Sequence, residues 1–196
     1  MVSVGFIVEG NSDFIILKSD RFQKLLKYTF NINSGESLIR VAHGRSFLKK
    51  NMKSWINSLI KDGVSHIFIL VDQDSKVDQR KNRKFEPDDC PIVVVDEIVK
   101  FHDNKHYFKK ERDIFIIMVR EMEAWFLADA HLGYVYDGLP EDILNPSELI
   151  EKTEKTTNHV LIANRVAKSF SLERAAEKAP SAKRFLNKLA EISQQQ

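Results

Sequence analysis

Short apolar runs that alternate with helix-like segments constrain the fold of this chain most strongly. The first run extends from Val2 to Val8 and is interrupted only by Ser3 and Gly5. A near-continuous apolar run of this kind is typical of a strand covered on both faces. Further runs of strand type are Leu38 to Ala42, His66 to Val71, Pro91 to Val95 and Ile114 to Val119.

The segments between the first runs carry apolar residues at helical spacing. Gly10, Asn11 and Ser12 predict a turn in which Ser12 is the N-cap of a helix. The apolar face of that helix would comprise Ile15, Phe22, Leu26 and Phe30, and that of the helix after Gly44 would comprise Leu48, Met52, Trp55 and Leu59. Strands that alternate with helices imply a mainly parallel sheet with right-handed crossovers. We therefore expect an α/β protein with a Rossmann-like sheet flanked by helices.

The C-terminal part differs in pattern, because runs of strand type stop beyond Pro140. Anchors of short helices in this part are Leu149, Val160, Ile162, Val166, Phe170, Leu172, Phe185, Leu186 and Leu189. We expect an α/β domain over residues 1–135 and a small helical appendage over residues 136–196 packed on it. The polar, basic and aromatic stretch from Lys100 to Arg112 predicts an insertion or a long connection.

Composition excludes several classes of protein. With 196 residues, 43% of them hydrophobic, the chain can build a core, and its net charge of +2 leaves nucleic-acid binding to local basic patches. The single Cys90 excludes an internal disulfide framework and a four-cysteine zinc site, and it fits a reducing compartment. Apolar runs are too short to span a bilayer, so we expect a soluble cytoplasmic protein.

Carboxylates stand where two of the expected strands end. Glu9 follows the first strand, and Asp72 and Asp74 follow the third. Ligands of open parallel sheets bind beyond the carboxyl ends of the strands, so these three side chains are expected at one edge. Carboxylates that lie close together repel unless a cation neutralises them, and their hard oxygens suit Mg²⁺ or Mn²⁺. The alternative is ordinary turn chemistry, because aspartates commonly follow strands in turns.

These residues also carry a family resemblance. Glu9-Gly10 and Asp72-Gln73-Asp74 resemble the two signatures of the Toprim domain shared by topoisomerases, primases and certain nucleases. Asp13 extends the likeness, because EGNSD resembles the E-G-x-x-D form of Toprim nucleases of the overcoming-lysogenization-defect type. The stretch REMEAWFLAD, which contains Glu123, resembles a segment of small bacterial Toprim-like proteins often found beside ATPases in anti-phage defence loci. The core of the resemblance covers the first two-thirds of the chain.

The resemblance implies a role for each matching residue. Glu9, Asp72 and Asp74 would be catalytic and would bind Mg²⁺ or Mn²⁺, with Asp13 and Glu123 as further metal ligands. Acidic residues in the first turn of a helix also simply complement the helix dipole, which is the alternative for Asp13 and Glu123.

Basic residues near these carboxylates are candidates for contacts with phosphate. Arg45 and Lys49 follow the second strand and could hold a phosphate near the metal. Arg80 and Lys81 follow the aspartates closely and could contact a nucleic-acid backbone. The alternative for all four is ordinary solvated surface.

Two functions of different classes follow. The first is a Mg²⁺-dependent nuclease that cleaves DNA or RNA and acts with an ATPase partner in anti-phage defence. The second is a catalytically silent Toprim-like adaptor that binds an ATPase or another protein. The acidic block of residues 113–158, with ten acidic and three basic side chains, would suit a protein partner. A topoisomerase or replicative primase needs a longer chain, a P-loop ATPase needs a GxxxxGK[ST] motif, and a haloacid-dehalogenase-type phosphatase would leave Glu9 unexplained.

Overall fold

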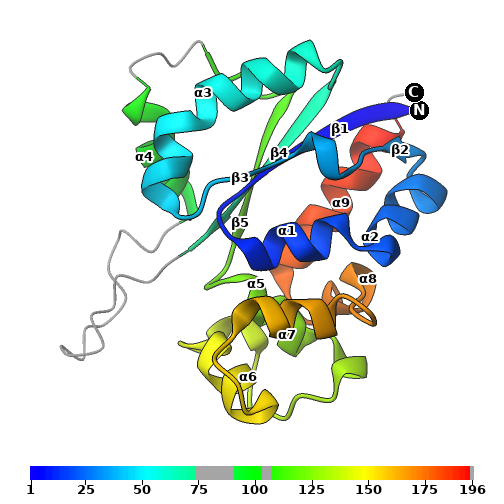
Figure 1. Ribbon diagram of the computed structural model, residues 1–196, viewed down its shortest axis with the longest axis vertical. Coiled ribbons are helices and arrows are strands. Elements are labelled where there is room, and N and C mark those ends of the chain that lie inside the picture. Colours follow the sequence, from blue (N-terminus) through cyan, green and yellow to red (C-terminus); the bar gives the residue numbers. More distant parts are fainter. Residues whose placement is uncertain (74–90, 103–106, 195–196) are drawn as a thin grey trace.

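A mostly parallel β-sheet forms the centre of the protein (Figure 1). The computed structural model describes residues 1–73, 91–102 and 107–194. Within these ranges the strands are β1 (Val2–Val8), β2 (Ile32–Asn33), β3 (Ile39–Val41), β4 (His66–Asp72) and β5 (Asp113–Met118). Their order is β2-β1-β4-β5, and β3 pairs with β1 beyond the end of β2. Every pairing is parallel, which confirms the predicted α/β class.

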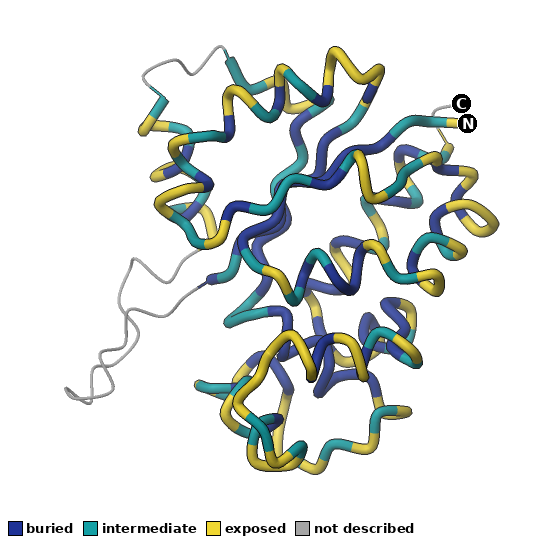
Figure 2. Tube along the Cα trace, viewed as in Figure 1, coloured by how far each residue is buried: buried dark blue, intermediate teal, exposed yellow. Residues whose placement is uncertain are grey.

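Both faces of this sheet are covered, which explains the continuous apolar runs. Along β1, Phe6 and Val8 contribute to the core on one face and Ile7 to the core on the other, and all three are fully buried. The same alternation continues in β4 and β5, as expected for strands whose successive side chains point to opposite faces. Figure 2 shows that most residues of β1, β4 and β5 are buried.

Two helices cover one face of the sheet, and the other described helices gather on the opposite side (Figure 1). The first pair is α3 (Arg45–Lys61) and α4 (Pro91–Phe101). The second group comprises α1 (Asn11–Lys18), α2 (Asp20–Lys24), α5 (Met122–Ala128), α6 (Pro146–Glu154), α7 (His159–Val166), α8 (Leu172–Ala175) and α9 (Pro180–Ser193). Short helical turns cover Leu25–Thr29, Glu36–Leu38, Ala130–Leu132 and Pro140–Asp142. Among the described helices, none combines the length and the apolar character needed to cross a membrane.

Close packing of α3 on β1 depends on Gly5. A Cβ atom at this position would lie 3.0 Å from the Leu59 side chain and 3.3 Å from the Leu38 carbonyl oxygen. The glycine that interrupts the first apolar run therefore admits helix α3 and the neighbouring backbone to the strand.

The sequence prediction of a strand from Pro91 to Val95 is wrong, because this run opens helix α4. Only Val94 and Ile98, one helical turn apart, are buried along it, whereas Ile92 is 72% exposed. A short β-branched run cannot be distinguished from a buried helix face by periodicity alone. Helix α4 extends to Phe101, so the stretch expected to be a connection begins inside a helix, and its residues 103–106 lie outside the described ranges.

The first predicted helix is present but is divided in two. Its N-cap is Gly10 rather than Ser12, and the chain becomes extended at Ser19, whose hydroxyl accepts a hydrogen bond from the Phe22 amide at 3.3 Å and so caps α2. The apolar residues predicted for this face are nevertheless buried. The prediction that Val160 anchors one of the C-terminal helices to the core is wrong, because this residue is 43% exposed.

The last helix contributes directly to the core beneath the sheet. Phe185 of α9 packs edge-on against Phe68 of β4, with ring centroids 5.2 Å apart, and stacks on Trp125 at 5.8 Å. Phe6 lies against both Phe68 and Phe185. The aromatic cluster therefore joins residues 136–196 to the sheet through one continuous hydrophobic core.

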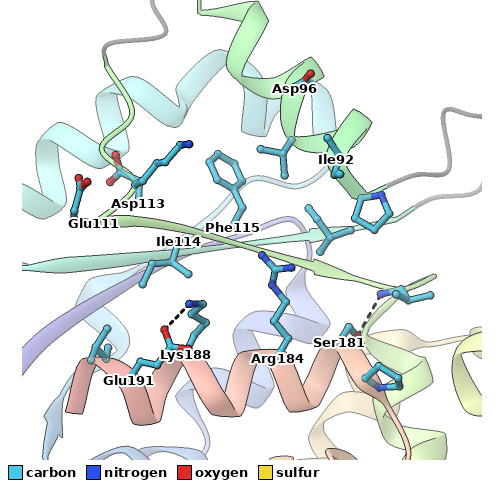
Figure 3. Close-up of a pocket in the computed structure, with 17 residues that line it drawn as sticks. Ile92, Asp96, Glu111, Asp113, Ile114, Phe115, Ser181, Arg184, Lys188 and Glu191 are labelled. Atoms are coloured by element: carbon cyan, nitrogen blue, oxygen red, sulfur yellow. Dashed lines mark hydrogen bonds and ion pairs between the residues drawn. The ribbon is translucent and has the colours of Figure 1, made fainter. Parts of the chain in front are cut away.

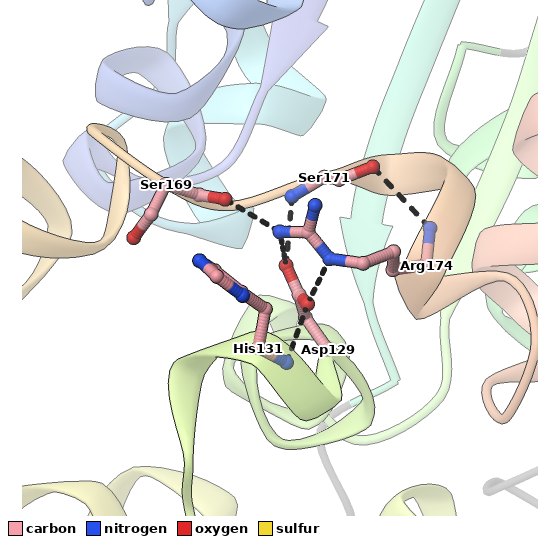
Figure 4. Close-up of polar contacts among 5 residues, drawn as sticks. All are labelled: Asp129, His131, Ser169, Ser171 and Arg174. Carbon is pink, nitrogen blue, oxygen red and sulfur yellow. Dashed lines mark hydrogen bonds and ion pairs between the residues drawn. The ribbon is translucent and has the colours of Figure 1, made fainter.

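A buried aspartate ties the end of α5 to the start of α8 (Figure 4). The carboxylate of Asp129 is fully buried and accepts two hydrogen bonds from the Arg174 guanidinium, at 2.6 and 2.8 Å. It also accepts hydrogen bonds from the amides of His131 and Ser171, at 3.1 and 2.8 Å. This planar pairing, completed by two amides, satisfies the charge within the protein.

Candidate functional site

The carboxyl ends of the strands bring several predicted residues to one edge of the sheet. Val8 pairs in register with Leu70, and Asp72 pairs with Met118, so Glu9, Asp72 and the residues that follow β5 lie at the same edge. Strand alternation places Asp72 on the sheet face that carries Phe68 and Leu70, which is also the face covered by α1 and α5. The predicted residues Asp74, Arg80 and Lys81 lie outside the described ranges.

Asp13 occupies the first turn of α1, immediately beyond the end of β1. Its Oδ2 accepts a hydrogen bond from the Gly10 amide at 2.9 Å, so the residue does cap its helix, as the alternative reading expected. The side chain is only 2% exposed. Burial, together with the charges of Glu123 and Glu9, raises the pKa of Asp13 to about 7 even though the Gly10 amide favours the charged form. Three carboxylates from three elements therefore influence one another at this edge.

Arg45 is the first residue of α3 and reaches the same strand ends from the other face of the sheet. Its Nε lies 3.7 Å from Glu9 Oε2, and its guanidinium donates a hydrogen bond to the main-chain carbonyl of Asp72. Gly44, with a φ of +114°, allows the chain to turn into α3 and donates its amide to the Glu9 carbonyl at 3.0 Å. Arg45 thus lies at the edge where the sequence predicted it, in an ion pair with a carboxylate.

Glu123 lies in the first turn of α5 and is held by a histidine that the sequence analysis did not identify. His159, the first residue of α7, places Nδ1 3.6 Å from Glu123 Oε1 and Nε2 2.9 Å from Glu151 Oε1. Its interaction with the Glu123 carboxylate, and the charges of Glu123, Glu151 and Glu121, raise the pKa of His159 to about 9. The histidine is therefore charged at neutral pH. A lone histidine at the start of a distant helix gives no sequence signal for this pairing.

The remaining predicted residues around the edge have other contacts. Lys49 forms an ion pair with Glu97 of α4 at 3.0 Å, so its contact with phosphate stays a prediction. Glu121 accepts a hydrogen bond from the Ser147 amide at 2.7 Å, and burial raises its pKa. Trp125, which follows in α5, is 1% exposed and belongs to the core.

Comparison with known proteins assigns the chain to a family. A family model described as a domain of unknown function (DUF4276) matches residues 8–190. The chain belongs to the DUF4276 family. No curated protein and no solved structure matches it. The DUF4276 match includes Glu9, Asp72 and helix α7, which begins with His159.

Carboxylates at this edge of the DUF4276 protein are oxygen donors of the kind that hard divalent cations prefer. They belong to Glu9, Asp13 and Asp72, and burial together with the charges of Glu123 and Glu9 raises the pKa of Asp13. In residues 1–73, 91–102 and 107–194, no three acidic, histidine or cysteine side chains are grouped closely enough to hold a metal ion. Binding of Mg²⁺ or Mn²⁺ by Glu9, Asp13 and Asp72, with Asp74 and Glu123 as further ligands, therefore stays a prediction from the sequence.

Proposed function

We propose that this edge of the sheet binds Mg²⁺ or Mn²⁺ and that the protein is a Toprim-type nuclease that hydrolyses phosphodiester bonds in DNA or RNA. The observation that supports the proposal is the burial of Asp13 beside Glu9 and Glu123, which raises its pKa to about 7. Functional sites are where such costly groupings of charge are retained, because a bound cation relieves them.

Each residue has a distinct role in this proposal. Glu9 and Asp72 lie on neighbouring strands and would orient the cation, and Asp13 would complete its neutralisation from α1. A bound divalent cation supplies charge stabilisation to phosphate oxygens and lowers the pKa of water. Arg45 holds Glu9 at the strand end and adds a fixed positive charge where a phosphate would approach.

The proposal is tested with purified variants and labelled DNA and RNA in the presence of Mg²⁺ or Mn²⁺. Glu9→Gln and Asp72→Asn are expected to reduce cleavage at least about 100-fold, because each removes a charged ligand without removing side-chain volume. Glu36→Gln is the matched control, since Glu36 precedes β3 and so lies at the opposite edge of the parallel sheet. Cleavage that survives both substitutions at the wild-type rate would refute the proposal.

A second candidate function is a catalytically silent adaptor that binds an ATPase or another protein. The observation that favours it is that two of the carboxylates already face protein cations, Glu9 beside Arg45 and Glu123 beside His159. Calorimetric titration with Mn²⁺ distinguishes the two candidates. Heat of binding that is lost in Asp13→Asn supports the nuclease, whereas absence of binding together with a stable complex with an ATPase supports the adaptor.

A further inference from the structure

Strand β5 ends the sheet and borders a groove that the proposed nuclease site does not use. The groove has a volume of about 750 Å³ and lies between α4 on one face of the sheet and α9 on the other (Figure 3). Its floor is apolar, with Val95, Ile114, Phe115 and Ile117 among the lining side chains. In the described part of the chain, no strand pairs with the outer edge of β5.

The backbone of β5 is oriented to accept another strand along this groove. The carbonyl of Arg112 accepts a hydrogen bond from the amide of Ile67, and the carbonyl of Met118 accepts one from the amide of Gln73. The even-numbered residues between Arg112 and Met118 therefore direct their N–H and C=O groups toward β4. Alternation then directs the N–H and C=O groups of Phe115 and Ile117 toward the open edge. An edge of this kind is a template for pairing with a further strand.

Charges at the rim of the groove favour a second copy of this chain over a strongly acidic or basic peptide. Lys110, Arg184 and Lys188 provide positive charge, and Asp96, Glu111 and Glu191 provide negative charge. Helix α9 runs antiparallel to β5. Ser181, at the start of α9, accepts a hydrogen bond from the Val119 amide at 3.4 Å, just beyond the C-terminal end of β5. Glu191, near the end of α9, lies toward the N-terminal end of β5, which follows Glu111 (Figure 3).

A two-fold axis perpendicular to the sheet would make these charges complementary. It would pair β5 antiparallel with β5 of the second copy and place the two α9 helices side by side in opposite directions. Arg184 of one copy would then face Glu191 of the other, twice in the same interface. From this arrangement we propose that the protein forms a homodimer through β5 and α9, with one continuous sheet across both copies.

The dimer is tested by sedimentation velocity and light scattering on the full chain. Wild-type protein is expected to have about twice the monomer mass of 22.7 kDa. Arg184→Glu and Glu191→Arg are each expected to shift the equilibrium to monomer, because each opposes like charges at the interface. The double reversal restores the opposite pairing and is expected to restore the dimer, whereas Lys61→Glu, at the exposed end of α3, leaves it unchanged.

Hydrogen exchange provides a second measurement that does not depend on mutation. The amides of Phe115 and Ile117 are expected to exchange more slowly as protein concentration rises, whereas amides of α3 remain unchanged. A wild-type monomer at every concentration overturns the proposal. So does a dimer that survives both single reversals, because its interface must then lie elsewhere.

Discussion

Two buried aspartates show how differently this protein treats a negative charge. Asp129 is fully buried, but Arg174 and two amides surround its carboxylate with four hydrogen bonds. Asp13 is almost as deeply buried, and backbone hydrogen bonds from Gly10 and Glu9 favour its charge, but its charged neighbours include the carboxylates of Glu9 and Glu123. The first carboxylate is satisfied by the fold, and the second is held at a cost that the fold alone does not explain.

This difference separates a structural role from a functional one. A buried ion pair with completed hydrogen bonds holds two segments together, and it needs no ligand. A buried carboxylate among like charges destabilises the folded state until a proton or a cation joins it. The contrast is therefore better evidence for a site at the strand ends than the number of acidic residues there.

The largest effect is expected from Asp129→Ala. The substitution removes the carboxylate that accepts hydrogen bonds from the Ser171 amide and the Arg174 guanidinium, and the guanidinium keeps its hydrogen bond to the Ser169 carbonyl. We expect the free energy of unfolding to fall by about 3 kcal/mol, which is the lower end of the range for removing one partner of a buried ion pair. The lower end applies because the Arg174 side chain is 31% exposed and water can partly solvate it. Urea denaturation measures this change. A loss no larger than that of Asp137→Asn, a substitution at an exposed position, would contradict the structural role.

A smaller effect of opposite sign is expected from Asp13→Asn. In the unfolded chain Asp13 releases its proton near pH 3.8, whereas in the folded protein its pKa is about 7. The contribution of Asp13 to the free energy of unfolding therefore falls as pH rises from 3.8 to about 7 and then levels off. Asparagine retains an acceptor for the Gly10 amide and removes the charge. Without divalent cations, we expect the variant to be more stable than the wild type above pH 7.

The comparison of Asp13→Asn with the wild type is made by thermal unfolding across this pH range. The difference in stability should disappear below pH 3.8, where both the folded and the unfolded chain carry a proton on Asp13. Added Mn²⁺ should stabilise the wild type above pH 7 and leave the variant almost unchanged. A difference that is independent of pH would show that Asp13 is not the group whose charge is costly.

The smallest effect is expected from His159→Gln. Because the pKa of His159 is raised from 6.5 to about 9, its stabilising contribution is fully present below pH 6.5 and is lost as pH rises through 9. The side chain is 48% exposed, so we expect a loss of less than about 1 kcal/mol at neutral pH. Titration of the His159 ring by NMR checks the assignment directly, and an ordinary pKa there would show that the ion pair with Glu123 does not form in solution.

Local patterns were sufficient to predict β1, β3, β4 and β5 and the edge of the sheet at which Glu9 and Asp72 lie, but not the short strand β2. The runs that form β1, β4 and β5 were recognisable because strands covered on both faces are apolar throughout. Once these strands are parallel, Glu9 and Asp72 must reach the same edge, so their proximity follows from topology. The error at Pro91 arose where a short β-branched run forms one face of helix α4.

The partners of these carboxylates could not be predicted in the same way. Arg45 reaches Glu9 only because Gly44 turns the chain at the strand end, and His159 reaches Glu123 only because α7 packs beside α1 and α6. Such pairings depend on how distant helices dock, and neither hydrophobic periodicity nor a local motif encodes that docking. Burial of Asp13 likewise follows from the packing around α1 and not from the EGNSD stretch itself.

The position of Phe185 has a consequence for the order of events during synthesis. Phe6 and Phe68 are made early, but the ring that packs against both of them belongs to α9, near the end of the described chain. Until Pro180–Ser193 has been made, the parts of β1 and β4 that Phe185 covers lack that cover. The nascent protein must therefore expose part of this aromatic cluster until α9 forms, a state that chaperones recognise and that invites aggregation.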